Sequence, residues 1–309
     1  MKDLSIIIVN YNTEALLKNC LETVYRSTIP IDFEVIVVDN ASRDGSREML
    51  KDDFPQVKLI ENSENRGFGS ANNQAMKIMS GEYALLLNSD TLLPRAAIGE
   101  LFYFMESCPE AAMACGQLLN RDGSKQNSIA GFPNLLSLMT NTPLLEYLFP
   151  ARYPSKRYHH AQAIEIDSGV GACLIVRKKA IDEVGMFDER YFFFFEETDW
   201  ARQMKKMGWK IYFVPSARIF HLQGVSIGDK FPSRVEFYRS RYQYLKKWNG
   251  NLIYAVSVTI IFIRLLINWL STAIGYILTL GMSKKMRGKL LLYSKLIRWH
   301  VIGCPDPRG

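Results

Sequence analysis

The sequence predicts an α/β protein with a helical appendage, and three observations lead to this prediction. Over residues 1–90, strand-like apolar segments alternate with helical ones, which is typical of parallel strands joined by right-handed crossovers. Polar clusters follow these strands directly, at the end of an open α/β sheet where ligands bind. Beyond Asn251 the chain becomes apolar and then basic. A chain of 309 residues can hold one large domain and such an appendage.

The elements can be placed in order along the chain. The first strand-like segments are 4–9, 33–38, 57–60 and 83–87, and the helical segments between them are 14–26, 46–53 and 69–79. The later elements are a helix at 94–106, a strand at 111–115, loops over 120–163 with a short apolar helix near 134–149, a strand at 164–176, helices at 178–184, 196–208 and 233–248, and a strand at 210–214. Asn10-Tyr11-Asn12 follows the first strand where a dinucleotide-binding GxGxxG would have to stand, and the chain has no Walker A sequence. Nicotinamide and P-loop enzymes are therefore excluded as classes.

The charge of the chain is unevenly distributed. Residues 252–309 contain eight Lys and Arg and one acid, which leaves 30 of each sign in residues 1–251 from totals of 38 and 31. A nucleic-acid enzyme would carry its excess along the body, so the basic tail indicates a local partner. The five cysteines are scattered and lack CxxC spacing, which is typical of free thiols in a reducing compartment. A strand-like segment follows Met1-Lys2-Asp3 directly, so no signal peptide is expected.

Six segments in a fixed order carry a family resemblance. They are IIIVNYN (6–12), VVDNASRDGS (37–46), ENRGFGSANN (64–73), LLLNSDT (85–91), GMFDERYFFFFEETDW (185–200) and FHLQGVS (220–226). On these segments, residues 1–250 resemble a family 2 glycosyltransferase of the GT-A fold, and are most similar to bacterial rhamnosyltransferase-like members. The resemblance implies a Rossmann-like, nucleotide-binding mixed sheet flanked by helices, and transfer of a sugar from a nucleoside diphosphate.

The resemblance implies a metal site. A leaving diphosphate is neutralised by a divalent cation with oxygen ligands, here Mg²⁺ or Mn²⁺. Asp90 matches the last residue of the family's DxD motif and is the expected metal ligand, while Asn88 replaces the first Asp. Asn88 removes one charge but can hydrogen-bond a ribose or a metal-bound water. His221 matches the family's late histidine, a second ligand for the metal or the diphosphate; its alternative role is that of a satisfied core histidine.

A second set of residues is expected to bind the nucleotide sugar. Asp39 ends the second strand and can accept a hydrogen bond from the imide N–H of uracil or thymine. Similar proteins hold the base at the end of the first strand, which assigns Val9 and Tyr11 to its flanks. Arg66 is expected to reach the nucleotide or phosphate. Asp44 is an equally good candidate for an ordinary helix cap.

The general base is sought in the acidic start of the helix at 196. By the family's pattern Glu197 is the base and Asp199 an orienting or acceptor-binding partner, with Glu196 beside them. Clustered carboxylates raise one another's pKa, as a base working near neutral pH requires. The alternative is an acidic first turn that merely complements the helix dipole. A single base with in-line attack implies inversion at the anomeric carbon.

The tail is predicted to associate with a membrane. Residues 252–282 are uncharged except for Arg264. Polar and small residues share one face of this helix: Ser257, Arg264, Asn268, Ser271, Gly275 and Thr279. Such a stripe is typical of a helix that lies in the membrane interface or packs on a partner. Nucleotide sugars are cytosolic, so the catalytic domain should be cytosolic, and a single span would place the cations at 284–298 on the opposite side, against the positive-inside tendency. An interfacial helix or a re-entrant pair is therefore favoured over a single span. The basic helix at 284–299 suits anionic lipid. The alternative is a homodimer contact.

Together these features predict a GT-A catalytic domain at 1–250 and a membrane-associated helical appendage at 251–309. The predicted activity is inverting transfer of L-rhamnose from dTDP-L-rhamnose to a lipid-linked saccharide of a surface polysaccharide such as O-antigen lipopolysaccharide. The predicted location is the cytoplasmic face of the bacterial inner membrane, and no nucleic acid is involved. Two alternatives stay open: a UDP-hexose or UDP-galactofuranose transferase, and a catalytically silent, membrane-bound partner of a glycan assembly complex.

Overall fold

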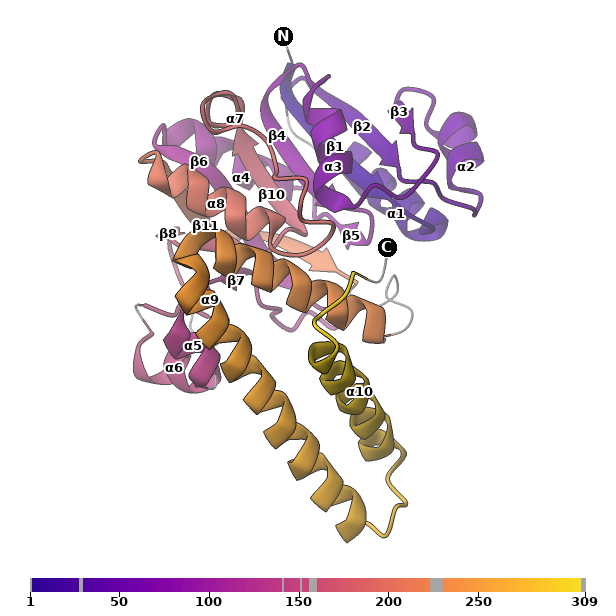
Figure 1. Ribbon diagram of the computed structural model, residues 1–309. Helices are drawn as coiled ribbons and strands as arrows, with labels where there is room; N and C mark the ends of the chain where they lie inside the picture. Colours follow the sequence, from indigo (N-terminus) through magenta and orange to yellow (C-terminus); the bar gives the residue numbers. More distant parts are fainter. Residues whose placement is uncertain are drawn as a thin grey trace. The chain divides into compact units, whose positions relative to one another are not determined.

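A computed structural model describes residues 2–27, 30–140, 142–150, 152–155, 160–222 and 230–306 (Figure 1). The chain divides into two compact units, each with its own core. The first unit combines Met1–Phe132 with Phe149–Ser226, and the second combines Pro133–Leu148 with Ile227–Gly309.

The first unit is built on a nine-stranded mixed sheet. Its order is β3 (Lys58–Glu61), β2 (Phe33–Asp39), β1 (Lys2–Asn10), β4 (Gly81–Asn88), β10 (Cys173–Arg177), β6 (Ala111–Leu119), β11 (Lys210–His221) and β5 (Thr91–Leu92), with β8 (Ile164–Glu165) paired to β11. Strands β3, β2, β1 and β4 are parallel, as the β–α alternation predicts. Strand β10 runs antiparallel between β4 and β6, so the sheet is mixed. A small second sheet pairs β7 (Ile129–Ala130) with β9 (Ser168–Gly169).

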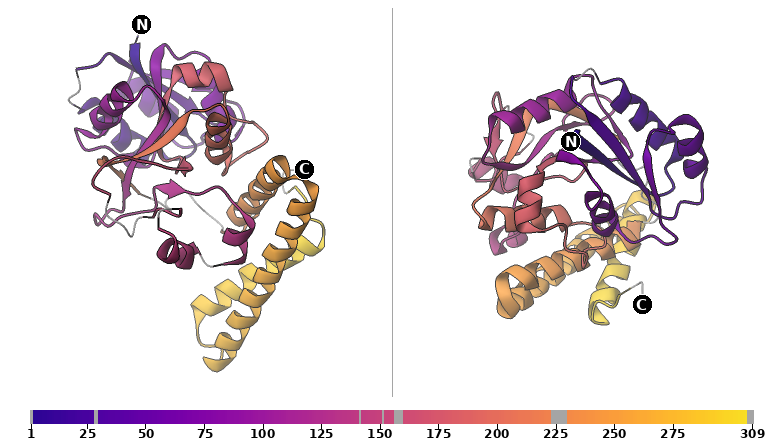
Figure 2. Two further views of the ribbon diagram at one scale, coloured as in Figure 1. Left: turned by 90° about the vertical axis from the view of Figure 1, so that its left-hand side faces the viewer. Right: turned by 90° about the horizontal axis from the view of Figure 1, so that it is seen from above.

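Helices cover both faces of this sheet (Figures 1 and 2). They are α1 (Glu14–Tyr25), α2 (Ser46–Asp53), α3 (Phe68–Met76), α4 (Ala97–Ser107), α7 (Lys178–Val184) and α8 (Glu196–Lys206). Residues of α1, α2 and α4 share one core with Ile6 and Ile8, whereas α3, α7 and α8 share the other with Ile7. Because successive side chains of a strand point to opposite faces, the continuous apolar run of β1 supplies both cores.

The carboxyl ends of the central strands meet at one edge of the sheet. Asn10, the last residue of β1, pairs with Asp39, the last residue of β2. On the other side of β1, Val9 pairs with Asn88 of β4. Strand β11 is longer than the predicted 210–214: it continues through a register irregularity between Val214 and Arg218 and ends at His221. This bulge lets one strand carry a histidine to the same edge.

The second unit is a helical hairpin with a short inserted pair of helices. It contains α9 (Lys230–Leu278), α10 (Lys284–Val301), α5 (Leu135–Met139) and α6 (Thr142–Leu148). Helix α9 is kinked at Gly250, where φ is +75°, and α10 runs back along it (Figure 2). Two contacts fix this antiparallel pairing: Tyr242 Oη lies 2.7 Å from His300 Nε2, and Trp269 Nε1 donates to Ser294 Oγ at 2.9 Å.

The boundary between the two units differs from the predicted division at residue 250. The predicted boundary coincides with the kink of α9, but the helix before the kink belongs to the second unit. The core of that unit contains Leu138 of α5, three residues from before the kink, two from after it and two from α10: Val235, Tyr242, Leu245, Ile261, Leu265, Leu296 and Trp299. The inserted segment 133–148 and residues 230–249 therefore fold with the appendage.

Candidate active site

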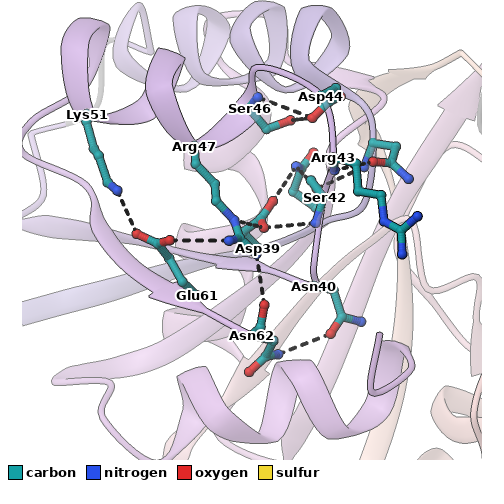
Figure 3. Close-up of polar contacts among 12 residues, drawn as sticks. Asp39, Asn40, Ser42, Arg43, Asp44, Ser46, Arg47, Lys51, Glu61 and Asn62 are labelled. Atoms are coloured by element: carbon teal, nitrogen blue, oxygen red, sulfur yellow. Dashed lines mark hydrogen bonds and ion pairs between the residues drawn. The ribbon is translucent and has the colours of Figure 1, made fainter. Parts of the chain in front are cut away.

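Asp39 is held in a dense polar network at the end of β2 (Figure 3). Its Oδ1 accepts hydrogen bonds from the Ser42 amide at 3.0 Å and from Arg47 Nε at 2.6 Å. Its Oδ2 accepts one from Asn10 Nδ2 at 3.0 Å. A fully buried carboxylate is stable only when it is paired in this way. Three of its roughly four lone-pair positions are used, and the side chain has no exposed surface in this arrangement.

Arg47 connects Asp39 to the neighbouring strand. Its Nη2 donates to the Asn62 carbonyl at 2.8 Å, and its Nη1 lies 3.5 Å from Glu61 Oε2 (Figure 3). Lys51 completes the chain with a 2.9 Å ion pair to Glu61. The position of the Asp39 carboxylate is thus fixed by α2 and β3 together.

Asp44 lies just before Gly45, the N-cap of α2, and its carboxylate contacts the first residues of two helices. Its Oδ1 accepts from both the amide and the hydroxyl of Ser46 at the start of α2. Its Oδ2 accepts from the amide of Glu14, the first residue of α1, at 2.9 Å. Burial raises the pKa of Asp44, but these hydrogen bonds outweigh it and the pKa is lowered on balance.

The other predicted nucleotide contacts surround this edge. Tyr11 is 49% exposed just beyond β1, and Val9 is half-buried. Arg66 has an exposed side chain, while its amide donates to Asn40 Oδ1 at 3.0 Å. At the next residue, Gly67, φ is +84° and an added Cβ would lie 2.5 Å from the Phe192 carbonyl oxygen. Only glycine fits at this close approach.

The two predicted metal ligands are brought together by the pairing of β5 with β11. His221 is the partner of Thr91 in this ladder, and the Leu222 amide donates to the Asp90 carbonyl at 2.9 Å. As a result His221 Nε2 lies 3.3 Å from Asp90 Oδ1, and both side chains are largely buried. Asn88, at the end of β4, is half-buried, and its carbonyl accepts from Thr91 Oγ1 at 2.8 Å.

The Asp90–His221 pair has the dimensions of two adjacent metal ligands. An octahedral ion with bonds of about 2.1 Å separates neighbouring donors by about 3 Å, close to the distance between these two atoms. Among the residues that the structure describes, no group of three or more His, Cys, Asp and Glu is arranged to hold a metal ion. Two protein donors completed by substrate phosphates and water form the type of site at which Mg²⁺ is commonly held. The residues present therefore fit a divalent cation.

The acidic start of α8 is held by unusual backbone. Phe194 and Phe195, directly before the helix, have φ values of +69° and +70°, a conformation that is strained for bulky residues and is concentrated at functional sites. Asp199 is fully buried and accepts hydrogen bonds from Tyr191 Oη at 3.2 Å and Gln203 Nε2 at 2.7 Å. Glu196 is 4% exposed. These two hydrogen bonds join Asp199 to the segment before α8 and to the next turn of α8. Because its side chain is fully buried, Asp199 has no surface to contact an acceptor in this arrangement.

Glu197 is less buried than its two acidic neighbours, Glu196 and Asp199. Its side chain is partly exposed, yet Oε2 is buried and makes no hydrogen bond to any described residue. Burial raises the pKa of Glu197 to about 7. The sequence attributed this rise to clustered carboxylates, whereas desolvation is its largest cause.

Glu197 also lies beside the end of β4. A Cβ added at Gly171 would be 3.7 Å from Glu197 Cγ, and the carbonyl of the next residue, Ala172, accepts from the Asn88 amide at 3.0 Å. The predicted base and the predicted metal-binding turn after β4 are thus on adjacent segments.

The structure adds residues that the sequence did not single out. Asn10 and Arg47 fix Asp39, Gly171 leaves room for Glu197, and Gln126 contacts His221. Two of these had a sequence signal: Asn10 follows a strand directly, and Gly171 stands in the segment 168–171, whose glycines indicate a close backbone approach or a bend. Of the segment FHLQGVS, the four residues at 223–226 lie outside the described residues.

A mixed sheet in this order, with polar side chains gathered at the carboxyl edge of its parallel half, has the GT-A fold. Residues 5–185 match the model of glycosyl transferase family 2, which is more than half of the chain, and the chain belongs to this family. The family and the fold that the six ordered segments predicted are thereby confirmed.

Individual relatives agree with this assignment. The chain is 27% identical over 259 residues to an N-acetylglucosaminyl-diphospho-decaprenol L-rhamnosyltransferase of Mycobacterium tuberculosis, covering 78% of this chain and 83% of that relative. It is 26% identical over 210 residues to the low-salt glycan biosynthesis hexosyltransferase Agl10 of Haloferax volcanii, covering 67% of this chain and 62% of the relative. Its fold is similar to that of the mannosyltransferase PcManGT from Pyrobaculum calidifontis, solved in complex with GDP-Man and Mn²⁺, with a TM-score of 0.59, 16% identity and coverage of 97% and 90% of the two chains.

Proposed function

We propose that this glycosyltransferase moves L-rhamnose from dTDP-L-rhamnose onto a lipid-linked saccharide, with inversion and with a divalent metal ion, during synthesis of a bacterial surface polysaccharide. The mycobacterial relative is named for rhamnosyl transfer to a diphosphate-linked lipid, which supports both the donor sugar and the class of acceptor. The observation that carries the proposed chemistry is Glu197: a carboxylate with a buried, unbonded oxygen and a pKa of about 7, next to the end of β4.

In the proposed reaction Glu197 is the general base. It takes the proton from the acceptor hydroxyl as that oxygen attacks the anomeric carbon from the side opposite the diphosphate. A pKa near the working pH is favourable for this step, because the carboxylate is then both ionised and basic. Asp199, fixed by Tyr191 and Gln203, positions the turn that carries Glu197. One base acting in line gives inversion, since no second nucleophilic carboxylate takes part.

The donor is proposed to bind across the carboxyl edge of the sheet. Asp39 uses its remaining Oδ2 position for the base, Tyr11 and Val9 flank the ring, and Arg66 reaches the phosphates. Asp90 and His221 would hold Mg²⁺ or Mn²⁺, whose charge neutralises the leaving diphosphate. The complex of the structurally similar mannosyltransferase with Mn²⁺ supports a divalent ion.

The second unit is proposed to lie on the cytoplasmic face of the membrane. Within the described part of the chain, one helix, α9, is long and apolar enough to cross a bilayer by its length and composition. Many of its exposed side chains are apolar: Leu252, Val256, Ile263, Ile267, Leu270, Ile274 and Ile277. Four polar or charged side chains of the same segment are also exposed: Thr259, Arg264, Asn268 and Ser271. Helix α10, paired along α9, carries six cations within its 18 residues: Lys284, Lys285, Arg287, Lys289, Lys295 and Arg298. Each such charge would be expensive inside the hydrocarbon, so the hairpin fits the headgroup region better than a span.

The predicted polar stripe of the appendage takes a different form in the structure. Ser257 is fully buried, and Arg264 donates to the carbonyls of Leu138 and Thr140 at the end of α5. The single charge of the apolar segment therefore caps a helix of the same unit. Asn268 and Ser271 of the predicted stripe remain exposed, but most exposed residues of α9 after Gly250 are apolar, which favours lipid; a homodimer contact is the alternative.

A thermal-shift panel tests the donor. The full chain is heated with dTDP, UDP or GDP, each with and without Mn²⁺. A ligand at about a hundred times its dissociation constant adds about 2.7 kcal/mol to the free energy of unfolding. Stabilisation by dTDP and Mn²⁺ together, above that by UDP, supports rhamnosyl transfer. Preference for UDP moves the donor to a hexose or galactofuranose, and no response to any nucleotide favours the silent-partner alternative, whose sequence support is Asn88.

Vesicle sedimentation of the full chain tests the membrane surface. Reversal of the four cations at the start of α10 (K284E, K285E, R287E and K289E) should release the protein from anionic vesicles, because each cation near such a surface contributes about 1 kcal/mol. Wild-type sedimentation with anionic but not neutral vesicles is the matched comparison. Retention of the variant on anionic vesicles would show that charge does not hold this unit there.

A further inference from the structure

Gln126 is a buried side chain that contacts His221 twice. Its Oε1 lies 3.1 Å from His221 Nδ1, and its Nε2 donates to the backbone carbonyl of His221 at 2.6 Å. Gln126 is 5% exposed, and its Nε2 donates also to Asn120 Oδ1 at 2.8 Å. One side chain therefore engages both the ring and the backbone of the predicted metal ligand.

The orientation of the Gln126 amide is determined by its partners. The His221 carbonyl can only accept a hydrogen bond, and Asn120 Oδ1 is also an acceptor, since Asn120 Nδ2 donates to Ser124 Oγ at 2.8 Å. Both acceptors face the same end of the glutamine, so that end must be its NH₂ group. A flipped amide would place a carbonyl oxygen 2.6 Å from another carbonyl oxygen.

This orientation determines which nitrogen of His221 carries the proton. With Oε1 of Gln126 facing Nδ1, the neutral imidazole must hold its proton on Nδ1 in order to donate. The lone pair of Nε2 then points to Asp90 Oδ1, which is 3.3 Å away. Two electron-pair donors placed side by side are repulsive when nothing lies between them, and they are suited to share a cation.

We propose that Gln126 is a positioning residue of the metal site: it holds the His221 ring and its Nδ1–H tautomer so that Nε2 is the ligand next to Asp90. This inference rests on the divalent-metal site of the proposed function. The backbone of Gln126 is itself fixed, because its N–H donates to the Leu118 carbonyl at 2.8 Å. The turn at the end of β6, residues 118–126, thus determines how the His221 ring is oriented as a metal ligand.

The tautomer is measured first, by ¹⁵N NMR of the metal-free full chain labelled at its four histidines, with His221→Asn to assign the signal. At a pH where the ring is neutral, His221 should show a protonated Nδ1 and an unprotonated Nε2. In Gln126→Met this preference should be lost. A protonated Nε2 in the wild-type protein, or an unchanged tautomer in Gln126→Met, would overturn the inference.

Metal affinity is measured second, from the free Mn²⁺ signal in electron paramagnetic resonance with dTDP or UDP present. Gln126→Met should weaken Mn²⁺ binding about 10- to 100-fold, the usual effect of losing a partner that orients a ligand. Gln117→Met is the matched control: it removes a buried glutamine of the same region that bonds Leu118, Gln126 and Ser128 but not His221. Equal losses in the two variants would mean a general structural effect and would overturn the inference.

The two readouts separate this inference from the proposed function. If the wild-type protein binds no Mn²⁺ with either nucleotide, the metal role of Asp90 and His221 fails, and Gln126 is not a metal-site residue. If Mn²⁺ binds and Gln126→Met binds it equally well, the metal site stands and the role of Gln126 alone is refuted.

Discussion

Two glutamates at opposite ends of the same sheet have opposite electrostatics. Glu34, at the amino end of the parallel strands, is 8% exposed. It accepts hydrogen bonds from Ser5 Oγ at 2.6 Å, from the amide and hydroxyl of Ser80, and from Lys58 Nζ at 2.6 Å. Burial alone would raise its pKa, but these donors lower the pKa to about 2. Glu197, near the carboxyl end, has a buried oxygen without such donors, and burial raises its pKa to about 7.

The difference is one of partners and not of residue type. A carboxylate that receives several donors is held ionised and joins neighbouring segments, whereas one that receives few keeps its basicity for a substrate. The amino end of the sheet therefore serves stability, and the carboxyl end retains groups that are incompletely bonded. This division is what a catalytic edge requires.

The largest expected effect is at the carboxyl end. Asp90→Ala should abolish transfer and the dependence of the rate on Mg²⁺ or Mn²⁺, because a single carboxylate oxygen faces His221 there. The rate of sugar transfer is measured across a metal titration. Full activity in this variant would show that Asp90 has no metal role, and would weaken the contrast between the catalytic carboxyl end and the stabilising amino end of the sheet.

The next effect tests the base. Glu197→Gln should slow transfer by about two to four orders of magnitude, the usual contribution of a general base, while donor binding is unchanged. Glu196→Gln is the matched control and should retain most of the rate. If Glu196→Gln is the inactive variant instead, the assignment of the base is wrong by one residue.

The pH dependence sharpens the same comparison. Because Glu197 acts ionised and its pKa is raised to about 7, kcat should fall as pH decreases below 7, about tenfold per unit, and level off above it. Glu34 is ionised throughout this range and adds no inflection. A rate that is independent of pH between 5 and 8 would contradict a base with this pKa.

The smallest effect is at the amino end. Glu34→Gln should leave kcat unchanged and lower the free energy of unfolding by about 1–3 kcal/mol, the usual contribution of hydrogen bonds to a charged group. The sign follows from the lowered pKa: the stabilisation by Glu34 is complete above its ordinary value of 4.5 and is lost as pH falls toward 2. Urea denaturation at pH 7 and near pH 3 measures both. If Glu34→Gln is as stable as wild type at pH 7, the hydrogen bonds of Glu34 do not stabilise the fold.

Much of the fold could be predicted from the sequence because its strands are continuous apolar runs that end in polar clusters. The bounds of β1, β2 and β4 and of α1 and α2 agree closely with those predicted. Strands β5 and β7 were missed since two residues carry no periodic pattern. The antiparallel direction of β10 depends on its pairing with β4 and β6, which local sequence patterns do not reveal.

The site could be predicted less well where a residue's role depends on a contact with a residue far away in the sequence. Asp90, His221 and Glu197 follow motifs; the structure places Asp90 beside His221, and Glu197 beside Gly171. Gln126 lies in a region without motifs, and its role depends on a residue at the end of another strand. The unit boundary was displaced for the same reason, because Leu138 packs with residues a hundred positions later.

The close approach at Gly67 has a consequence for the order of events in the reaction. The amide of Phe68 donates to the Phe192 carbonyl at 2.8 Å, which joins the loop carrying Arg66 to the segment that leads into α8. In the proposed reaction, a movement of Arg66 toward the donor diphosphate would therefore displace the segment that leads to Glu197. We expect donor and acceptor to bind in sequence, donor first, and product-inhibition kinetics that showed random addition would exclude this coupling. On this proposal, donor binding would position the base before the acceptor hydroxyl reaches it, and the nucleotide sugar would be less exposed to hydrolysis by water.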